Sequence, residues 1–518
     1  MTVATGFRTL PRLLDEAARA HGENIALEDT DGCRLTYAAL DDLTSRLAGR
    51  LKSLGVERGD RVGICMPKSI NSIVCIFGAL RAGAAYVPAD YSAPMQRNRF
   101  IFENCQTRVI CADEPRASLL SEEGLKPELV VFPGDSTTGV GAPWLDEADT
   151  LDDRVEVDEA DLAYILYTSG STGVPKGVTH THASAASFVR WAAETIEPRS
   201  DDRFSSHAPF HFDLSILDLY VPLTAGAAIV LVGEELGKAP QELAPCIAER
   251  RISIWYSVPS ILAMLAEYGR LERHDYSALR TVLFAGEVFP IKHLQALRRQ
   301  WPKPVYYNLY GPTETNVCTA CRLPDDIDEH RQTPYPIGPA CSNVRALVLD
   351  QDGRPVERNG EGLLHIHASG PVMKGYWGDE QRTRDAFYTD EDGERWYNTG
   401  DVVTLDEEGN FNYLGRRDRM VKRRGYRIEL GEVESGIYRH PRVREAAAVA
   451  RTTDEGVSIV VFYTSDTGEK LSIIELKQFS MKNLPSYMLP DRFVFMPEMP
   501  RTSTDKVDYQ SLLRQAQS

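Results

Sequence analysis

The sequence lacks a long uninterrupted run of apolar residues. Its most apolar helical stretch, residues 70–87, is broken by Gly78, Arg81 and Gly83, whereas a membrane-spanning helix needs about 20 consecutive apolar residues. The first 16 residues also lack the apolar segment of a secretory signal peptide. We therefore expect no membrane partner and a cytoplasmic location.

Basic residues are outnumbered in this chain. Its 518 residues include 58 Lys and Arg against 75 Asp and Glu, so the net charge is -17. Proteins that bind nucleic acids need positively charged surfaces. The one basic run, residues 416–427, contains a single aromatic residue, Tyr426. We therefore expect no nucleic-acid partner.

Cysteines are too sparsely paired to form a zinc site. Of the nine, Cys318 and Cys321 have the CxxC spacing, but no second such pair and no histidine pair accompanies them. A structural zinc site needs four such ligands. We interpret these two residues as buried thiols, and the odd number of cysteines as free thiols in a reducing compartment. Any metal is expected on carboxylate instead.

Hydrophobic patterning indicates an α/β protein. A leucine repeat of helical period over residues 40–54 ends at Gly55, and a predicted strand over residues 61–65 precedes a helix from residue 70 and a strand over residues 85–87. Such βαβ units predict a parallel sheet with helices on both faces. The alternation resumes over residues 227–310. Between them, the acidic segment 145–161 is interpreted as a solvated connection.

The pattern changes in the last third of the chain. After about residue 333, short strands alternate with Asp-Gly and Glu-Gly turns, which predicts a small β-rich subdomain. The last hundred residues alternate helix and strand again, enough for a compact domain. We expect a large N-terminal region, residues 1–414, of doubly wound αβαβα-type subdomains plus the β-rich subdomain. A small mobile α+β C-terminal domain, residues 415–518, would follow.

The most informative segment is residues 168–177, which read Thr-Ser-Gly-Ser-Thr-Gly-Val-Pro-Lys-Gly after an apolar run predicted to be a buried strand. Small residues let backbone amides approach an anion, and the hydroxyls and Lys176 add donors and charge. Pro175 opposes the helix that a Walker loop would open there. The segment predicts phosphate binding, with an ordinary flexible loop as the alternative.

Five more motifs follow in order. Residues 310–314 read Tyr-Gly-Pro-Thr-Glu, and residues 397–401 read Tyr-Asn-Thr-Gly-Asp. Residues 415–434 carry a basic run, residues 484–490 read Leu-Pro-Ser-Tyr-Met-Leu-Pro, and residues 500–508 contain Lys506. Together with the phosphate loop, this set resembles the adenylate-forming superfamily, specifically the adenylation domains of nonribosomal peptide synthesis, over essentially the whole chain. The family uses ATP to convert a carboxylate into an acyl adenylate, releasing pyrophosphate.

The resemblance implies an ATP site. The phosphates would be held by Thr168, Ser169, Gly170, Ser171, Thr172, Gly173 and Lys176, of which Thr168 and Lys176 are also expected to take part in catalysis. Nucleotide contacts would also come from Tyr310, Gly311, Thr313, Asp401 and Arg416. Tyr310 would lie against adenine, Asp401 would accept both ribose hydroxyls, and Arg416 would lie near the ribose.

The same resemblance implies the catalytic groups. Glu314 would ligate Mg2+, a hard cation that prefers oxygen ligands. Lys506 would bridge the substrate carboxylate and the adenylate oxygen. The plain alternatives are a turn residue for Asp401, a helix N-terminal carboxylate for Glu314 and a surface lysine for Lys506. The chain departs from the family pattern before Lys506, where Thr504-Asp505 replaces a glycine-bearing pair.

A second half-reaction is also implied. In the family, the small domain swings about a hinge, here Asp418, after adenylation. Arg424 and Gly425 would then line the path of a phosphopantetheine arm. No Gly-Gly-x-Ser carrier segment and no His-His-x3-Asp condensation motif occurs in the sequence. The acceptor is therefore expected to be a separate carrier protein, or free coenzyme A.

Asp213 indicates the substrate class. Amino-acid-activating members of the family place an aspartate at this position to pair with the substrate ammonium, and a helix cap is the alternative role. Aligned by motif, the pocket would be lined by Asp213, Leu214, Leu217, Tyr256, Leu283, Ala285, Leu309, Val317, Cys318 and Lys506. No charged residue remains to meet a substrate side chain, so a compact apolar amino acid is expected.

The pocket resembles that of stand-alone enzymes that activate L-proline for pyrrole formation. There a carrier protein receives the prolyl group and a flavin-dependent dehydrogenase oxidises it. Pipecolate, valine and leucine remain competitors, because apolar pockets distinguish one methylene by only about 1–3 kcal/mol. An acyl- or aryl-coenzyme A synthetase of the same fold and a non-catalytic scaffold are the alternative functions.

Overall fold

In a computed structural model, the chain divides into two compact units. The residues described are 6–134, 140–146, 155–169, 174–326, 328–416, 419–453, 456–501 and 507–517. The first unit comprises Met1–Tyr91, Asn98–Tyr167 and Gly177–Gly415. The second unit comprises Ser92–Arg97, Thr168–Lys176 and Arg416–Ser518.

An eight-stranded sheet dominates the first unit, in the order β14-β13-β12-β11-β9-β10-β1-β2. Its six central strands pair in parallel, and the edge strands β2 and β14 pair antiparallel. The strands are β1 (Ile25–Glu28), β2 (Arg34–Thr36), β9 (Arg203–Ser206), β10 (Ala228–Leu231), β11 (Ile254–Ser257), β12 (Thr281–Phe284), β13 (Val305–Tyr310) and β14 (Thr319–Arg322).

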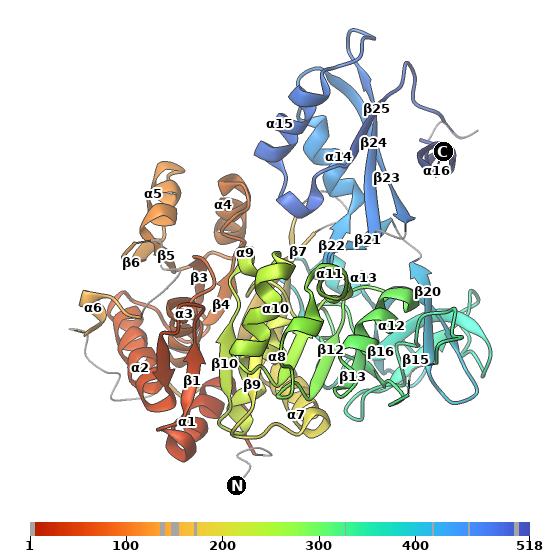
Figure 1. Ribbon diagram of the computed structural model, residues 1–518. Coiled ribbons are helices and arrows are strands. Elements are labelled where there is room, and N and C mark those ends of the chain that lie inside the picture. Colours follow the sequence, from red (N-terminus) through yellow and green to blue (C-terminus); the bar gives the residue numbers. More distant parts are fainter. Residues whose placement is uncertain are drawn as a thin grey trace. The chain divides into compact units, whose positions relative to one another are not determined.

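Three helices cover one face of this sheet: α10 (Pro240–Glu249), α11 (Pro259–Tyr268) and α12 (Ile291–Gln300) (Figure 1). Proline opens α10 and α11, as suits a first turn whose amide has no partner within the helix. Leucines of all three helices pack with Trp255 and Trp301 in one buried cluster. The one-turn helix α9 (Glu234–Gly237) and two 3-10 turns, Pro222–Thr224 and Leu271–Arg273, complete this part of the chain.

A second sheet has the order β17-β8-β7-β4-β3-β5-β6. Its strands are β3 (Arg61–Cys65), β4 (Ala85–Pro88), β5 (Val109–Asp113), β6 (Glu128–Phe132), β7 (Leu162–Thr168), β8 (Lys176–Thr181) and β17 (Gly375–Tyr376). The associated helices are α1 (Leu10–His21), α2 (Tyr37–Ser53), α3 (Ile70–Arg81), α4 (Met95–Asn104), α5 (Glu114–Glu122), α6 (Pro143–Asp146), α7 (His182–Ile196) and α8 (Ser215–Tyr220). The helix predicted over residues 40–54 and the strands over 61–65 and 85–87 are confirmed.

A single apolar core joins the two sheets. Residues of α1, α3, α7 and α8 pack in it with strand residues of both sheets, such as Leu27 of β1 and Tyr86 of β4. Helices shared between two sheets and covering their outer faces give the predicted doubly wound αβαβα arrangement. One expectation is wrong: Leu145 is fully buried in this core, on α6, and does not belong to a solvated connection. Residues 147–154 lie outside the described part of the chain.

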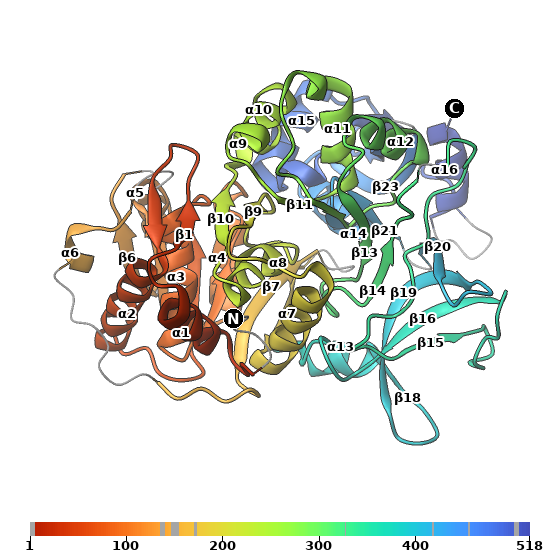
Figure 2. The same cartoon turned by 60° about the horizontal axis from the view of Figure 1, so that its bottom comes forward.

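The predicted β-rich subdomain is a five-stranded sheet of the order β15-β16-β19-β18, with β20 also paired to β19 (Figure 2). Two of its turns are held by an aspartate side chain in the same way. The Asp350 side chain accepts hydrogen bonds from the amides of Asp352 and Arg354, and the Asp406 side chain accepts them from the amides of Glu408 and Asn410. The elements are β15 (Ala346–Leu349), β16 (Glu361–His367), α13 (Glu380–Asp385), β18 (Phe387–Thr389), β19 (Arg395–Leu405) and β20 (Phe411–Arg416).

The second unit combines a hairpin, a three-stranded sheet and helices. The apolar sides of α14 and α15 and of the sheet form its own core around Val433, Ile437 and Leu476. The elements are β21 (Met420–Arg423), β22 (Tyr426–Glu429), α14 (Leu430–Tyr438), β23 (Val443–Thr453), β24 (Gly456–Ser465), α15 (Ile473–Asn483), the 3-10 turn Ser486–Met488, β25 (Arg492–Phe495) and α16 (Tyr509–Gln517).

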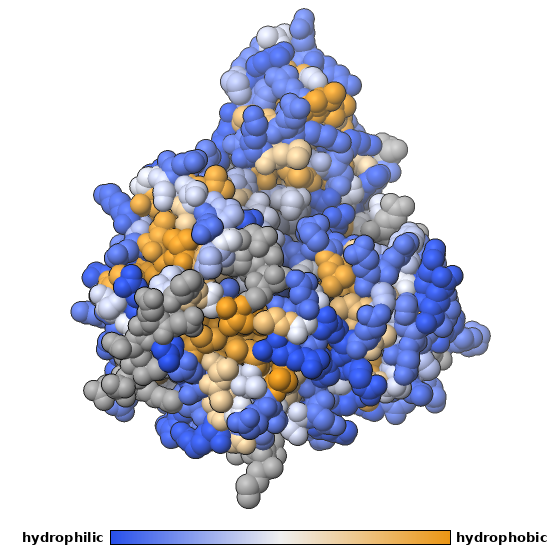
Figure 3. Space-filling view, turned by 60° about the vertical axis from the view of Figure 1, so that its left-hand side comes forward, coloured by the Kyte–Doolittle hydropathy of each residue, from blue (hydrophilic) through white to orange (hydrophobic). Residues whose placement is uncertain are grey.

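The surface carries no extended apolar band on the face drawn in Figure 3, where hydrophobic side chains form several patches bordered by hydrophilic ones. The most exposed large apolar side chains are Ile474 and Met481 of α15. Among the residues that the structure describes, no helix is both long and apolar enough to cross a membrane.

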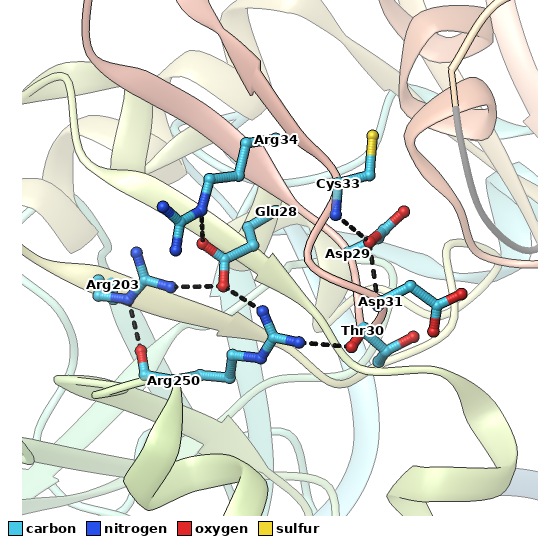
Figure 4. A network of polar contacts seen from close by, with 8 residues as sticks. All are labelled: Glu28, Asp29, Thr30, Asp31, Cys33, Arg34, Arg203 and Arg250. Carbon is cyan, nitrogen blue, oxygen red and sulfur yellow. Dashed lines mark hydrogen bonds and ion pairs between the residues drawn. The ribbon is translucent and has the colours of Figure 1, made fainter.

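A buried carboxylate ties the edge of the eight-stranded sheet to its neighbours (Figure 4). Glu28 of β1 is fully buried and accepts hydrogen bonds from Arg34 at 2.8 Å and Arg250 at 2.7 Å, while Arg203 lies 2.9 Å away. Burial alone would raise the pKa of Glu28, but the hydrogen bonds from Arg203 and Arg250 outweigh burial and hold the pKa below its ordinary value. The ionised carboxylate therefore stabilises the fold.

We predict that Glu28→Gln lowers the free energy of unfolding of the first unit by about 2–4 kcal/mol at pH 7, because three guanidinium groups lose their shared counter-charge. A depressed carboxyl pKa contributes stability above the ordinary glutamate pKa of about 4.3 and loses it as the pH falls through the folded value. Urea unfolding from pH 7 down to pH 3 should therefore show the difference shrinking. The exposed Glu23→Gln is the control, and an equal loss in both variants would contradict the prediction.

Candidate functional site

The loop between β13 and β14 is held by a close backbone approach. A Cβ on Gly311 would lie 1.6 Å from the carbonyl oxygen of Asn316, so only glycine fits. Asn316 has a φ of 50°, and the amide of Cys318 donates to the carbonyl of Tyr310 at 2.8 Å, closing the loop. The tight loop 311–318 presents Thr313, Glu314 and Asn316, all buried.

His180 of β8 supports the loop 311–318 through hydrogen bonds. Its Nε2 lies 2.8 Å from the carbonyl oxygen of Thr313, so Nε2 carries the proton and donates. Its Nδ1 then accepts from Ser184 at 3.1 Å and from Asn316 at 3.3 Å. Burial lowers the pKa of His180 to about 4, so the ring is neutral at pH 7 and this tautomer persists. The ring also stacks on Tyr164.

Tyr310 and Asp401 come together at the end of β13. The Tyr310 hydroxyl donates to the carboxylate of Asp401, and both side chains are buried. Burial, followed by the negative charge of Asp401, raises the pKa of Tyr310 well above its ordinary value, so the phenol remains a donor. Asp401 lies within β19, and its amide donates to Thr399. It is therefore a strand residue rather than the turn residue of the alternative interpretation.

Glu314 is fully buried in the loop, away from any helix N-terminus, and accepts a hydrogen bond from the Tyr376 hydroxyl at 2.7 Å. A carboxylate oxygen is the ligand type that Mg2+ prefers, and Mg2+ commonly needs only one or two protein carboxylates beside phosphate oxygens and water. The residue therefore fits the predicted metal role. No group of three or more His, Cys, Asp or Glu side chains suited to a metal occurs in the described part of the chain.

The CxxC pair is two free thiols. Cys318 is fully buried beneath the loop, whereas Cys321 is only partly buried, so the expectation of two buried thiols holds for the first and is wrong for the second. Cys321 lies on β14, the last strand of the sheet order, and the amide of the preceding Ala320 donates to the carbonyl of Pro339.

The predicted phosphate loop connects β7 to β8 and is described only at its ends. Thr168, the last residue of β7, has a buried hydroxyl with no hydrogen-bond partner among the described residues. The Ser169 hydroxyl donates to the carbonyl of Arg427 at 2.7 Å and accepts from the amide of Glu429, within the second unit. Lys176 opens β8, so no helix follows, as Pro175 predicted.

A small cavity in the first unit is lined by Phe188, Asp213, Leu214, Tyr256, Ala285, Gly311, Asn316 and Val317. Five of the predicted substrate residues are among these: Asp213, Leu214, Tyr256, Ala285 and Val317. Four other predicted substrate residues that the structure describes are buried and absent from the lining: Leu217, Leu283, Leu309 and Cys318. Phe188 and Asn316 were missed by sequence reasoning, because single residues of α7 and of the loop carry no motif of their own.

Among the residues that the structure describes, Asp213 is the one charged residue of the cavity lining. It lies two residues before the first residue of α8, Ser215. Burial raises the pKa of Tyr256 well above its ordinary value, and the negative charge of Asp213 adds to the effect. The same two causes act on Tyr164, which is also influenced by Tyr86. The cavity thus combines apolar walls with a single negative charge.

Other predicted residues lie in the second unit or outside the described part of the chain. Arg424 and Gly425 form the two-residue turn of the β21–β22 hairpin, with φ of 50° and 78°, as a tight hairpin requires. Arg416 ends β20. Six predicted residues lie outside the described part of the chain: Gly170, Ser171, Thr172, Gly173, Asp418 and Lys506. Their functions stay predictions.

Comparison with protein families gives two matches. Residues 14–377 match the AMP-binding enzyme family, and residues 432–506 match the AMP-binding enzyme C-terminal domain. The first match alone covers more than half of the chain.

Two curated relatives match over nearly the full length. Both are L-proline--[L-prolyl-carrier protein] ligases. The one from Streptomyces coelicolor is 40% identical over 97% of this chain and 95% of its own length. The one from Pseudomonas fluorescens is 38% identical over 98% of this chain and 99% of its own length.

Solved structures share the fold. The amide bond synthetase McbA from Marinactinospora thermotolerans superposes with a TM-score of 0.84 at 24% identity, covering 97% of this chain and 99% of its own. Holo-PA1221, an NRPS protein containing adenylation and PCP domains, superposes with a TM-score of 0.81 at 25% identity, covering 98% and 84%. The predicted fold class is therefore confirmed.

We predict that Gly311→Ala lowers the unfolding temperature by several degrees, because a methyl group 1.6 Å from a backbone oxygen must displace the loop 311–318. Gly233→Ala is the matched control, since a Cβ there meets nothing within 4 Å and the φ of -62° is ordinary. Differential scanning fluorimetry of both variants checks this. Equal unfolding temperatures would mean that the loop accommodates a side chain.

Proposed function

This chain belongs to the AMP-binding enzyme family, and from that premise we propose that it activates L-proline with ATP as prolyl-AMP and transfers the prolyl group to a carrier protein. The resemblance inferred from the six motifs is thereby confirmed at the level of the family. The observation that carries the substrate assignment is the apolar cavity with one carboxylate, Asp213. The names of the two full-length relatives support it.

The reaction has two steps that share one acyl group. In the first, a carboxylate oxygen of proline attacks the α-phosphorus of ATP, the bond to the bridging oxygen breaks, and pyrophosphate leaves. In the second, the phosphopantetheine thiol loses its proton and attacks the carbonyl carbon, and AMP leaves with the bonding electron pair. Charge spreads over phosphate oxygens in the first transition state, so fixed donors and cations stabilise it.

Each motif has a role in the proposal. Residues 168–176 hold the phosphates, Tyr310 and Asp401 hold the nucleoside, and Glu314 holds Mg2+, which supplies charge neutralisation at the phosphates. The Tyr310 hydroxyl bonded to Asp401 fixes the carboxylate that accepts the ribose hydroxyls. Tyr376 does the same for Glu314. Both carboxylates are thus oriented before a ligand binds, which reduces the reorganisation needed on binding.

Proline recognition follows from the cavity. Asp213 pairs with the secondary ammonium, which has two N–H donors, and the walls formed by Leu214, Ala285 and Val317 accept the ring. A charged substrate side chain would lose its hydration without gaining a partner there. Pipecolate differs by one methylene and is expected to be the strongest competitor.

The partners follow from the same assignment. The acceptor is proposed to be a separate phosphopantetheinylated carrier protein, approached past Arg424 and Gly425 with Asp418 as the hinge. A flavin-dependent dehydrogenase would then oxidise the loaded prolyl group. The reaction is placed in the cytoplasm, where ATP is available.

The proposal is tested by amino-acid-dependent ATP–pyrophosphate exchange with the twenty proteinogenic amino acids, pipecolate and pyrrole-2-carboxylate. We expect proline to give the dominant signal. A different dominant amino acid would keep the chemistry and overturn the substrate. Silence with every amino acid, together with thioester formation from an acyl or aryl acid and coenzyme A, would establish the alternative coenzyme A synthetase.

We predict that Asp213→Asn raises the KM for proline at least 100-fold in the exchange assay, because the substrate ammonium loses its only charged partner on the cavity wall. The KM for ATP should stay within about twofold, since the residue faces the amino acid. Normal proline activation by the folded variant would exclude Asp213 from recognition.

We predict that Lys506→Ala reduces prolyl-AMP formation at least 100-fold, because the lysine supplies the charge that bridges the two reacting groups. Transfer of the prolyl group from chemically prepared prolyl-AMP to the carrier should remain within about threefold of wild type. Equal losses in both half-reactions would show that Lys506 supports the fold or both steps. Lys470→Ala, a lysine of the same unit outside the motif, is the control.

A further inference from the structure

A second cavity in the first unit shares a wall segment with the amino-acid cavity. It is lined by Ile64, Met66, Lys68, Pro88, Ala89, Tyr91, Pro209, Phe210, His211 and Glu234. Residues 209–211 line this cavity, and residues 213 and 214 line the amino-acid cavity. A six-residue segment, 209–214, therefore contributes to both walls and carries Asp213.

Lys68 anchors the start of the segment that leads to Asp213. Its side chain is almost fully buried, and its amine donates a 2.7 Å hydrogen bond to the carbonyl of Ser206, the last residue of β9. The amine also lies 5.7 Å from the centre of the Phe210 ring. Burial lowers the pKa of Lys68 to about 8, against the negative charges of Asp218 and Glu234.

Asp218 lies at the other end of the segment, on α8, and is fully buried. Neither of its carboxylate oxygens has a well-formed hydrogen bond to a described residue. Burial raises its pKa well above the ordinary value, and the positive charge of Lys68 is the strongest influence that opposes this rise. A buried charge without a partner is costly, so each residue makes the ionised form of the other less unfavourable.

We propose that buried Lys68, through its contacts with Ser206 and Phe210, positions the segment 206–214 and thereby holds Asp213 toward the amino-acid cavity, with the buried carboxylate of Asp218 as its electrostatic complement. The inference rests on the proposed role of Asp213 in binding the substrate ammonium. Lys68 holds the first residue of this segment, Ser206, by a hydrogen bond, and Asp218 lies on the helix that follows the segment. Neither residue lines the amino-acid cavity, so both are positioning residues.

The charges of Lys68 and Asp218 also affect the electrostatics of the amino-acid cavity. Tyr256, on the cavity wall, is influenced by the negative charges of both Asp213 and Asp218. Two carboxylates in one low-dielectric region repel each other, and a cation that attracts one of them reduces that repulsion. Lys68 therefore stabilises the arrangement in which Asp213 stays charged and available to an ammonium group.

The test is a comparison of KM values in the proline-dependent exchange assay. Lys68→Met keeps the length of the side chain and removes its charge, and we expect the KM for proline to rise at least tenfold while the KM for ATP stays within twofold. Lys68→Arg should restore the KM for proline to within about threefold of wild type. Lys238→Met, at an exposed lysine of the same unit, should change neither.

A double variant separates the electrostatic attraction between Lys68 and Asp218 from simple packing. Lys68→Met/Asp218→Asn removes both charges, so it should recover at least half of the logarithmic change in the KM for proline that Lys68→Met causes. If Lys68→Met is too unstable to assay, Asp218→Asn alone must raise the KM for proline selectively.

An unchanged KM for proline in the folded single variants, or equal rises for proline and ATP, would overturn the inference. Absence of proline-dependent exchange in the wild-type protein would instead overturn the proposed function, so the two failures are distinguishable.

Discussion

The candidate site depends on one backbone contact, the approach of Gly311 to the carbonyl of Asn316. Without a side chain at Gly311, the loop after β13 folds back on itself and is closed by the bond between Cys318 and Tyr310. Everything that the loop carries is then fixed in relation to the sheet. Glu314 meets Tyr376 on one side, and Asn316 and Val317 form the cavity wall on the other.

In the proposed function, this arrangement places nucleotide and amino-acid recognition on one short segment. Tyr310, at its start, reaches Asp401, and Val317, near its end, lines the amino-acid cavity. Neutral His180 holds the middle of the loop through the carbonyl of Thr313. A rigid loop of this kind suits a reaction in which a carboxylate must meet a phosphorus atom at a set angle.

The sequence predicts the order of helices and strands in this protein well. It predicts less well which environment each apolar side chain occupies. The strands before the phosphate loop and before residues 310–314 are apolar runs, and each is followed by a glycine-containing turn. Both features are local sequence signals of a buried strand and its end. Leu217 and Leu283 were assigned to the pocket by motif, yet they are absent from the cavity lining, because an apolar residue suits a core and a pocket wall equally well. The burial of Leu145 likewise has no local signal within an acidic segment.

The supporting contacts could not be predicted because their partners are distant in sequence. His180 and Thr313 are 133 residues apart, and Lys68 and Ser206 are 138 apart. A lone polar residue in an apolar stretch shows only that some partner is needed. Which partner it finds is decided by the packing of whole layers.

The Glu28 network affects whether the edge of the eight-stranded sheet can pair with a strand of another protein chain. The strand β2 is an edge of the eight-stranded sheet and spans only three residues, and its Arg34 is held over Glu28. Short edge strands with charged side chains resist pairing with a strand of another chain. The opposite edge strand, β14, spans four residues and ends in Arg322. Both edge strands of the largest sheet are thus short and carry an arginine, which disfavours aggregation through strand pairing.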